Sequence, residues 1–169
     1  ELFNVDMLNA LSSMPDGAVD MTFTSPPFKQ DDVVGDYWEQ YDKWFRQIMR
    51  VTGKVACIVQ SAQNLNHLIS HYPPLRTLVW GKGVMRYSFR WNPILVYQIS
   101  DYKANSRIWS DAFGVTAVIG QWKDHRYQDP EVLYQTVIGM FKECRIVLDP
   151  FMGSGTTGVA CLHLGKDFI

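Results

Sequence analysis

Two short segments of the chain carry residue types that could hold a small molecule and act on it. Residues 149–158 read DPFMGSGTTG, and residues 24–28, far upstream, read TSPPF. Spaced glycines between a strand and a helix let the backbone approach a nucleoside cofactor and present free N–H groups at the helix start. The upstream segment is a stiff turn in which a hydroxyl and a proline-held carbonyl precede an aromatic ring. Such a turn suits a planar base.

The residues around the glycines favour one type of cofactor over others. The carboxylate of Asp149 would repel a phosphate, but it could pair with the ammonium and sulfonium of S-adenosylmethionine. Val159 stands where a phosphate-binding Walker loop needs lysine, and Met152 and Thr156 stand where a nucleophile elbow around Ser154 needs glycine. Residues 153–158 also match G-x-G-x-x-G, the motif of dinucleotide-binding enzymes. Such an enzyme is the weaker alternative, because we do not expect this chain to contain the second half of a dinucleotide-binding fold.

In this order, the two segments resemble the DNA amino-methyltransferases of the subgroup whose catalytic motif precedes the cofactor motif. The family pattern D-P-F-x-G-S-G-T-T covers residues 149–157. The resemblance implies that four matching residues bind the methionine part of S-adenosylmethionine: Asp149, Phe151, Gly153 and Gly155. Protein and small-RNA methyltransferases with a similar turn place the cofactor loop first, which sets them aside.

Two other segments match the family more loosely. Residues 125–130, HRYQDP, resemble its H-P-x-Q-K-P, which implies that His125 and Gln128 face the methionine carboxylate. Asp129 stands where the family has lysine. Near the start, Asn4-Val5-Asp6 resembles the family's G-D, which implies that Asp6 reaches the adenine amino group of the cofactor. The alternative for Asp6 is a helix N-cap before Met7.

The catalytic pattern of the family, (D/N/S)-P-P-(Y/F/W), is matched by Ser25, Pro26, Pro27 and Phe28. An exocyclic amino group is a poor nucleophile because its lone pair is delocalised into the ring. The Ser25 hydroxyl and the Pro26 carbonyl could each accept a hydrogen bond from one N–H of this amino group and so direct its lone pair at the methyl group. Phe28 would stack on the flipped base. Serine at this position resembles the cytosine N4 enzymes more than the adenine N6 enzymes, which implies cytosine N4 as the favoured target. The rival interpretation is a non-catalytic nucleic-acid-binding relative.

Charge predicts where DNA would bind. The net charge is −1, which argues against a uniformly basic surface, but basic residues predominate between Arg76 and Arg107. Residues 98–124 are the candidate target-recognition segment and are too short for a separate recognition domain. The alternative is a solvated basic face. The candidate DNA contacts are Lys82, Arg86, Arg90, Lys103 and Arg107.

The remaining composition excludes several classes. The three cysteines lack the spacing of a zinc or redox site, and His67 and His71 lack the glutamate of a zinc-protease helix, so no metal is predicted and a solvated helix face is expected. No apolar run is long enough to span a membrane. We expect a cytoplasmic prokaryotic or phage protein of restriction–modification type that can form a homodimer.

Alternating strands and helices must position these residues. They predict a single catalytic domain over residues 1–169, an α/β three-layer sandwich with a mostly parallel sheet, and the resemblance implies the Rossmann-like methyltransferase fold. The predicted strands are 19–23, 54–60, 75–80, 93–99, 145–148 and 166–169. The predicted helices are 7–14, 37–51, one across 65–69, 130–141 and 156–164.

Overall fold

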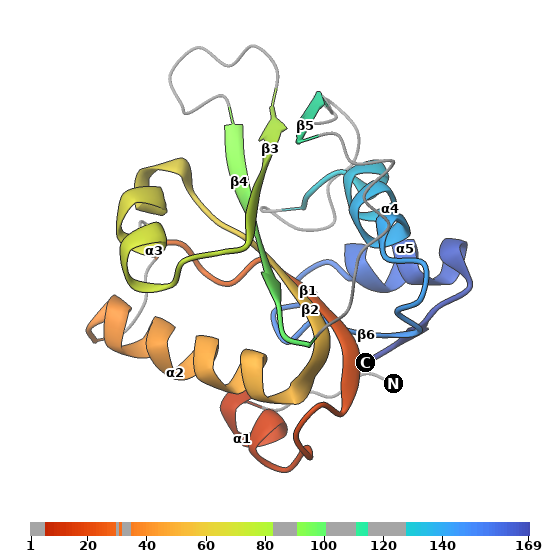
Figure 1. Cartoon of the computed structure of the whole chain (residues 1–169), viewed down its shortest axis with the longest axis horizontal. Coiled ribbons are helices and arrows are strands. Elements are labelled where there is room, and N and C mark those ends of the chain that lie inside the picture. Colours follow the sequence, from red (N-terminus) through yellow and green to blue (C-terminus); the bar gives the residue numbers. More distant parts are fainter. Residues whose placement is uncertain (1–5, 30, 32–34, 83–90, 101–110, 115–127) are drawn as a thin grey trace.

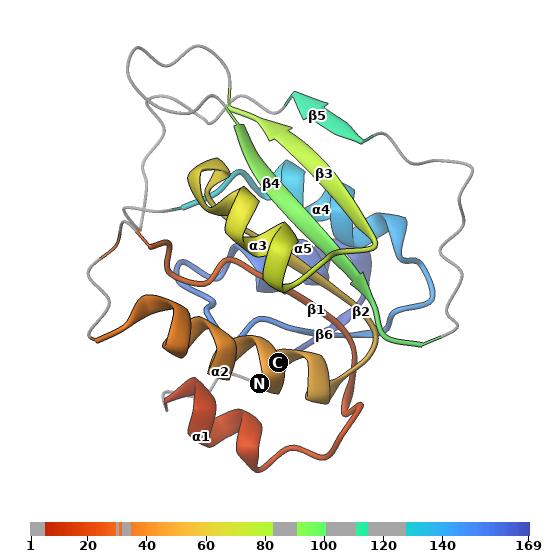
Figure 2. The same ribbon diagram turned by 60° about the vertical axis from the view of Figure 1, so that its left-hand side comes forward.

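The computed structural model describes residues 6–29, 31, 35–82, 91–100, 111–114 and 128–169. In these residues a seven-stranded sheet lies between two layers of helices, as Figures 1 and 2 show. The elements follow one another in the order α1 (Met7–Ser12), β1 (Val19–Thr24), α2 (Tyr37–Val51), β2 (Thr52–Val59), a 3-10 turn (Ala62–Asn64), α3 (Leu65–His71), β3 (Arg76–Gly81), β4 (Trp91–Gln98), β5 (Ala112–Gly114), α4 (Glu131–Met140), β6 (Ile146–Leu148), α5 (Thr156–Leu164) and β7 (Asp167–Phe168).

The sheet is mostly parallel, as predicted. Its strand order is β5-β3-β4-β2-β1-β6-β7. Parallel pairing joins β1 to β2 and β6, β6 to β7, and β3 to β5, whereas β4 runs antiparallel to both β2 and β3. β4 follows β3 without an intervening described helix, and strands joined in that way can lie antiparallel, whereas parallel neighbours need a crossover.

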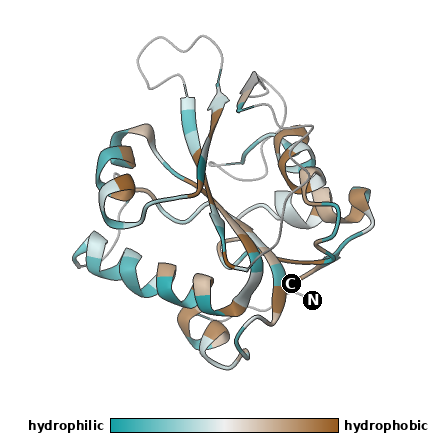
Figure 3. Ribbon diagram, viewed as in Figure 1, coloured by the Kyte–Doolittle hydropathy of each residue, from teal (hydrophilic) through white to brown (hydrophobic). Residues whose placement is uncertain are grey.

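The two faces of the sheet bury separate cores, which makes the fold a three-layer sandwich. β2 shows the alternation: Val55, Cys57 and Val59 pack with residues of α4 and α5, and Ala56 and Ile58 pack with residues of α1, α2 and α3. Figure 3 shows the difference between the layers, because α2 is largely hydrophilic along its length and α4 largely hydrophobic. α2 buries one stripe of its surface and exposes the rest to water, so most of its residues are polar. α4 packs against both the sheet and α5, so it can be apolar over more of its surface.

An irregularity in β1 changes which face its side chains cover. The pairing of β1 with β2 shifts register between Val19 and Met21. Val19 therefore belongs to the core beneath α1 and α2, and Met21 and Phe23 belong to the core beneath α4 and α5. In a regular strand these three residues would share a face, since side chains alternate with a period of two.

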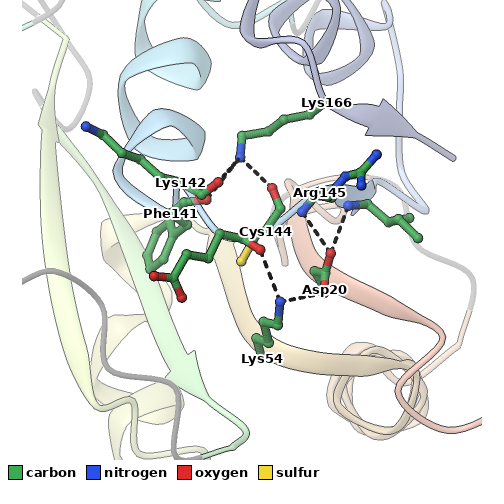
Figure 4. Close-up of polar contacts among 9 residues, drawn as sticks. Asp20, Lys54, Phe141, Lys142, Cys144, Arg145 and Lys166 are labelled. Atoms are coloured by element: carbon green, nitrogen blue, oxygen red, sulfur yellow. Dashed lines mark hydrogen bonds and ion pairs between the residues drawn. The ribbon is translucent and has the colours of Figure 1, made fainter.

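Polar contacts fasten the amino ends of β1 and β6 (Figure 4). The Asp20 carboxylate accepts hydrogen bonds from the amides of Arg145 at 2.8 Å and Ile146 at 3.1 Å, and it pairs with the Lys54 ammonium at 2.8 Å. Next to this cluster, the Lys166 ammonium donates to main-chain carbonyls that include that of Phe141 at 3.0 Å. These contacts lie at the amino ends of the strands, away from the segments expected to do chemistry.

The structure adds a strand within residues 98–124, whose role in target recognition stays a prediction. The described part of this segment contributes β5, a short strand that pairs with β3 at the edge of the sheet and that the sequence pattern did not predict. The segment is therefore in part an element of the sheet. Of the helices that the structure describes, none is long and apolar enough to cross a membrane.

Candidate active site

The two chemistry-bearing segments meet at the carboxyl ends of neighbouring parallel strands. Thr24 is the last residue of β1, and Asp149 directly follows β6. The Thr24 hydroxyl donates to Asp149 Oδ1 at 2.6 Å, joining positions 125 residues apart. The carboxyl edge of a parallel sheet is where α/β proteins bind ligands. The turn at residues 25–28 and the glycine loop at residues 153–155 therefore flank one site.

Asp149 is a buried carboxylate held by three donors. The amide of Phe151 donates to Oδ1 at 3.1 Å, beside Thr24, and the Thr157 hydroxyl donates to Oδ2. Burial raises the pKa of Asp149, and the hydrogen bonds from Thr157, Thr24 and Phe151 lower it only in part. A carboxylate that is costly to bury without a countercharge is a suitable partner for a bound cation.

The glycine loop needs glycine at both predicted positions. Gly153 has φ 54° and Gly155 has φ 81°, a region that L-residues with side chains avoid. Gly155 directly precedes α5, and its amide donates to the Met152 carbonyl at 2.9 Å. The tight turn brings the backbone to the carboxyl edge of the sheet, and no side chain at these two glycines intervenes there.

Hydrogen bonds with Tyr37 and Asp31 hold the proline turn, residues 25–28, in place. The Tyr37 hydroxyl, at the start of α2, donates to the Pro27 carbonyl at 2.8 Å. Asp31 accepts from the Phe28 amide at 2.6 Å and donates its own amide to the Phe28 carbonyl at 2.8 Å. The turn is thus fixed by contacts as well as by the two proline rings.

These contacts leave the two predicted acceptors available. Among the described residues, no hydrogen bond engages the Ser25 hydroxyl or the Pro26 carbonyl. Ser25 and Phe28 are half-buried, whereas Pro26 is buried. The turn therefore carries a hydroxyl oxygen and a carbonyl oxygen without internal partners, on a backbone that its neighbours hold still.

Sequence analysis missed the polar residues behind this turn. Gln60, which directly follows β2, donates to the Tyr37 hydroxyl at 3.3 Å and accepts from the Asn64 amide group at 3.2 Å. All three residues are buried, and burial raises the pKa of Tyr37, so its hydroxyl stays a donor at neutral pH. Polar residues at the carboxyl end of a buried strand were the signal that could have found Gln60.

Of the other predicted cofactor residues, Phe151, Gln128 and Asp6 are described by the structure. The Phe151 ring packs edge-on against Trp44 of α2, with centroids 5.1 Å apart. Gln128 is half-buried before α4. The Asp6 carboxylate accepts from the Asn9 amide at 3.1 Å, which confirms the N-cap interpretation, and its contact with adenine stays a prediction. His125 lies outside the described residues.

Asp129, which replaces the lysine of the family pattern, has a contact of its own. It accepts a hydrogen bond from the Tyr134 hydroxyl at 2.9 Å. Tyr134 is buried and packs edge-on against Phe23, with centroids 4.6 Å apart. Burial, with the nearby charges of Asp129 and Asp149, raises the pKa of Tyr134. The substitution thus places a carboxylate near Asp149.

The predicted DNA contacts are mostly outside the described residues, since only Lys82 is described. Its ammonium lies 4.7 Å from the centroid of the Trp80 ring. Within the described ranges, no three histidine, cysteine or acidic side chains are grouped as metal ligands would be. Outside the described ranges lie Arg86, Arg90, Lys103 and Arg107.

The sandwich and the strand-end site define an α/β protein of three layers with a candidate site at the carboxyl edge of its sheet, and comparison with known proteins gives the family. The family model described as DNA methylase, for N6 and N4 methyltransferases, matches residues 77–169. The chain belongs to this family.

Curated relatives agree with the family. The Type II methyltransferase M2.DpnII of Streptococcus pneumoniae is 34% identical over 96 residues, which are 55% of this chain and 35% of that protein. M2.LlaDCHI of Lactococcus lactis subsp. cremoris is 33% identical over 96 residues, with the same coverage. The chain thus spans about a third of the length of the curated relatives it matches.

Solved structures agree with the fold. The cytosine-N4-specific PvuII DNA methyltransferase superposes with a TM-score of 0.78 at 16% identity, covering 98% of this chain and 78% of that one. The M1.HpyAVI–SAM complex superposes with a TM-score of 0.68 at 19% identity, covering 99% of this chain and 90% of that one. These similarities confirm the predicted methyltransferase fold.

Proposed function

We propose that the chain, as one catalytic domain, transfers methyl from S-adenosylmethionine to the exocyclic amino group of a base flipped out of DNA. The observation that carries the proposal is the hydrogen bond from Thr24 to Asp149. It puts the turn that would hold the base next to the loop that would hold the cofactor. Membership of the DNA methylase family and the names of the relatives support the same reaction.

The residues at the glycine loop fit this cofactor. Asp149 offers a buried negative charge for its ammonium, and Gly153 and Gly155 leave the backbone uncovered. We assign Phe151, Gln128, His125 and Asp6 to the same site on the resemblance. When bound, S-adenosylmethionine supplies the methyl group as an electrophile. The loop orients it toward the carboxyl edge of the sheet.

The turn performs the other half of the reaction. Ser25 Oγ and the Pro26 carbonyl accept hydrogen bonds from the two N–H groups of the amino group, which turns its lone pair out of conjugation and toward the methyl carbon. As the new N–C bond forms, the nitrogen releases one of these two protons to solvent. The prolines, Tyr37 and Asp31 fix these acceptors before the base arrives, so little reorganisation is needed at the moment of reaction. Phe28 stacks on the base.

Within this function we favour cytosine N4 as the target over adenine N6. The support is the serine that opens the turn. The adenine N6 enzymes that the chain resembles usually carry aspartate or asparagine at this position. DNA is the proposed partner, and Lys82 with the basic residues at 86, 90, 103 and 107 are its proposed phosphate contacts. Incubation with labelled cofactor and mixed DNA, followed by digestion to nucleosides, identifies the methylated base.

Ser25→Ala tests the mechanism. The change removes one acceptor but leaves the Pro26 carbonyl and the Phe28 ring. Losing a preorganised polar contact at a reacting centre costs on the order of 10²–10³ in rate. Single-turnover methyl transfer should therefore fall steeply, while the affinities for cofactor and DNA stay close to those of the wild type.

Two outcomes separate the alternatives. A Ser25→Ala variant as fast as the wild type removes the role given to the hydroxyl. A wild-type chain that binds DNA but methylates no base is the non-catalytic binding relative. Ser70→Ala, on the exposed side of α3, is the matched control, because its hydroxyl only donates back to the Asn66 carbonyl.

A further inference from the structure

Four side chains form a column beside the proline turn. The Lys29 ammonium lies 5.4 Å from the centroid of the Trp38 ring. The Trp38 and His67 rings stack with centroids 3.6 Å apart and planes at 20°, and the His67 and His71 rings stack at 3.9 Å and 13°. We call these four residues the cation–aromatic column. It draws one residue from the turn, one from the start of α2 and two from α3.

The column is more than the solvated helix face that the sequence indicated. His67 is half-buried against Trp38, and Lys29 and His71 are exposed at the two ends. The His71 ring is also tethered by its Nδ1, which lies 2.9 Å from the His67 carbonyl. Two imidazoles are thereby kept face to face, although like charges on such a pair repel each other.

The column lies next to the proposed base-binding turn. Lys29 directly follows Phe28, and Trp38 follows Tyr37, whose hydroxyl binds the Pro27 carbonyl. Figure 2 shows α3 and the start of α2 on the same side of the molecule, with the chain that leaves β1 passing toward them. A DNA strand whose base enters the turn must pass its phosphates close to this place.

Three acidic side chains near the column in the described part of the chain already have hydrogen-bond partners. Asp31 accepts the Phe28 amide, Asp36 accepts the Glu39 amide at the start of α2, and Asp42 pairs with Arg46 and accepts from the Tyr72 hydroxyl. Among the described residues, the charges that act on the His67 ring are those of His71 and Lys29. Burial lowers the pKa of His67, and the charges of His71 and Lys29 lower it further.

Resting on the proposed function, we propose that the cation–aromatic column binds the phosphate backbone of the DNA strand that carries the target base, and that DNA binding there is accompanied by uptake of a proton on His67. Phosphates offset the mutual repulsion of Lys29 and the imidazoles, so binding favours the charged form of His67. The Trp38 face holds the column in register with the turn. Affinity for DNA then increases as the pH falls.

The expected size follows from linkage. A histidine whose pKa rises by about one unit in the complex strengthens binding by about tenfold once the pH is below both values. Burial and the charges of His71 and Lys29 lower the pKa of His67 in the free protein, so the gain begins as the pH falls through the higher pKa of the complex and is complete only below the lower pKa of the free protein. Salt screens the same contacts, so the Lys29 phosphate pairing should also appear in the salt dependence.

The test measures binding of the purified chain to a short labelled duplex of mixed sequence by fluorescence anisotropy, from about pH 8 to about pH 5. The double variant with His67→Gln and His71→Gln should bind as the wild type does at the upper pH and lose most of the gain at the lower pH. His163→Gln is the control, since His163 pairs with Glu131 between α4 and α5, on the other face of the sheet. It should keep the wild-type slope.

A second variant keeps the proposal open to refutation if the double variant folds poorly. Lys29→Gln should lower the slope of log affinity against log salt by about 0.9. If both variants keep the wild-type pH and salt slopes while the wild type methylates DNA, the column is only a packing feature and the proposal is overturned alone. If the wild type neither binds nor methylates DNA, the proposed function is overturned and the column's role falls with it.

Discussion

At the scale of single residues, the site contains a carboxylate, Asp149, whose ionised form destabilises the fold. Asp149 is 7% exposed, and its raised pKa means that the folded chain holds a proton there more tightly than the unfolded chain does. The corresponding stability is present at low pH and is lost as the pH rises through the folded-state pKa. At neutral pH the ionised carboxylate therefore costs stability, which cofactor binding could offset.

Asp149→Asn separates these two effects. The amide oxygen can still accept from Thr24, but the charge is gone, so the variant should unfold at a higher temperature than the wild type at pH 7. Its affinity for S-adenosylmethionine should fall by roughly 10–100-fold, the usual worth of a hydrogen bond to a charged group. Thermal unfolding and calorimetry measure the two quantities. A variant that is both less stable and equally tight for the cofactor contradicts this account.

Sequence reasoning found the site residues that have a motif and missed those that only support one. Ser25 and Asp149 were predicted because each stands in a pattern with a chemical purpose. Tyr37 was predicted only as the first residue of a helix, and nothing in its neighbours indicates that its hydroxyl would reach the Pro27 carbonyl. That contact depends on the orientation of α2 relative to β1, which local periodicity does not contain.

At the scale of elements, prediction succeeded where one periodic pattern covers the whole element. The bounds 37–51 and 156–164 match α2 and α5, because an amphipathic stripe defines the first and the glycine loop and Gly165 delimit the second. β5 was missed because three residues at a sheet edge carry no alternation. The composition of β4 does not give its direction, since a buried strand reads the same either way. The signal for its reversal was that no helix was predicted between it and β3.

Two glycines in the paired helices α4 and α5 should respond oppositely to alanine. A β-carbon at Gly158 would come within 2.9 Å of the Phe168 ring of β7, whereas one at Gly139 would only touch Leu164 at 3.6 Å. Alanine gains about 1 kcal/mol of helix propensity at either place. Overpacking at residue 158 costs roughly 1–3 kcal/mol, which cancels or exceeds that gain.

Chemical unfolding of the two variants checks this prediction. Gly139→Ala should raise the free energy of unfolding by about 0.5–1 kcal/mol, and Gly158→Ala should leave it unchanged or lower it by up to about 2 kcal/mol. Equal stabilisation by both changes would mean that β7 gives way without cost. Gly158 would then not be the residue that sets the approach of α5 to the sheet.

At the scale of the whole molecule, the two ends of the strands have different roles: one end holds the candidate site and the other holds a polar cluster that stabilises the fold. The carboxyl ends of β1, β2 and β6 hold the candidate site, and the amino ends hold the Asp20 cluster of Figure 4. Burial raises the pKa of Asp20, but the hydrogen bonds from Lys54 and from the amides of Ile146 and Arg145 outweigh it and lower the pKa below its ordinary 3.8. The cluster thus stabilises the fold only while Asp20 is ionised.

The acid sensitivity of the fold follows with its sign. The contribution of Asp20 is complete above the unfolded pKa and is lost as the pH falls through the lower folded pKa. Asp20→Asn should lower Tm by about 2–4 °C at pH 7, corresponding to about 1 kcal/mol, and the difference from the wild type should shrink below about pH 4.

Asp167→Asn is the control for this acid-sensitivity test, because Asp167 is exposed and lies 4.0 Å from the Arg145 guanidinium. Such surface pairs contribute little. A gap between Asp20→Asn and the wild type that stays constant into acid would contradict the role of the Asp20 charge.

Because Thr24 and Asp149 lie far apart in the sequence, β1 must wait during synthesis on the ribosome before β6 can pair with it. β1 emerges early and can pair with β2, but Asp149, which directly follows its other neighbour β6, comes 125 residues after Thr24. At about 5–20 residues per second, one edge of this central strand waits roughly 6–25 s for its partner. Chains stalled before residue 145 should therefore expose an unpaired strand edge and aggregate, whereas chains released after α5 should not.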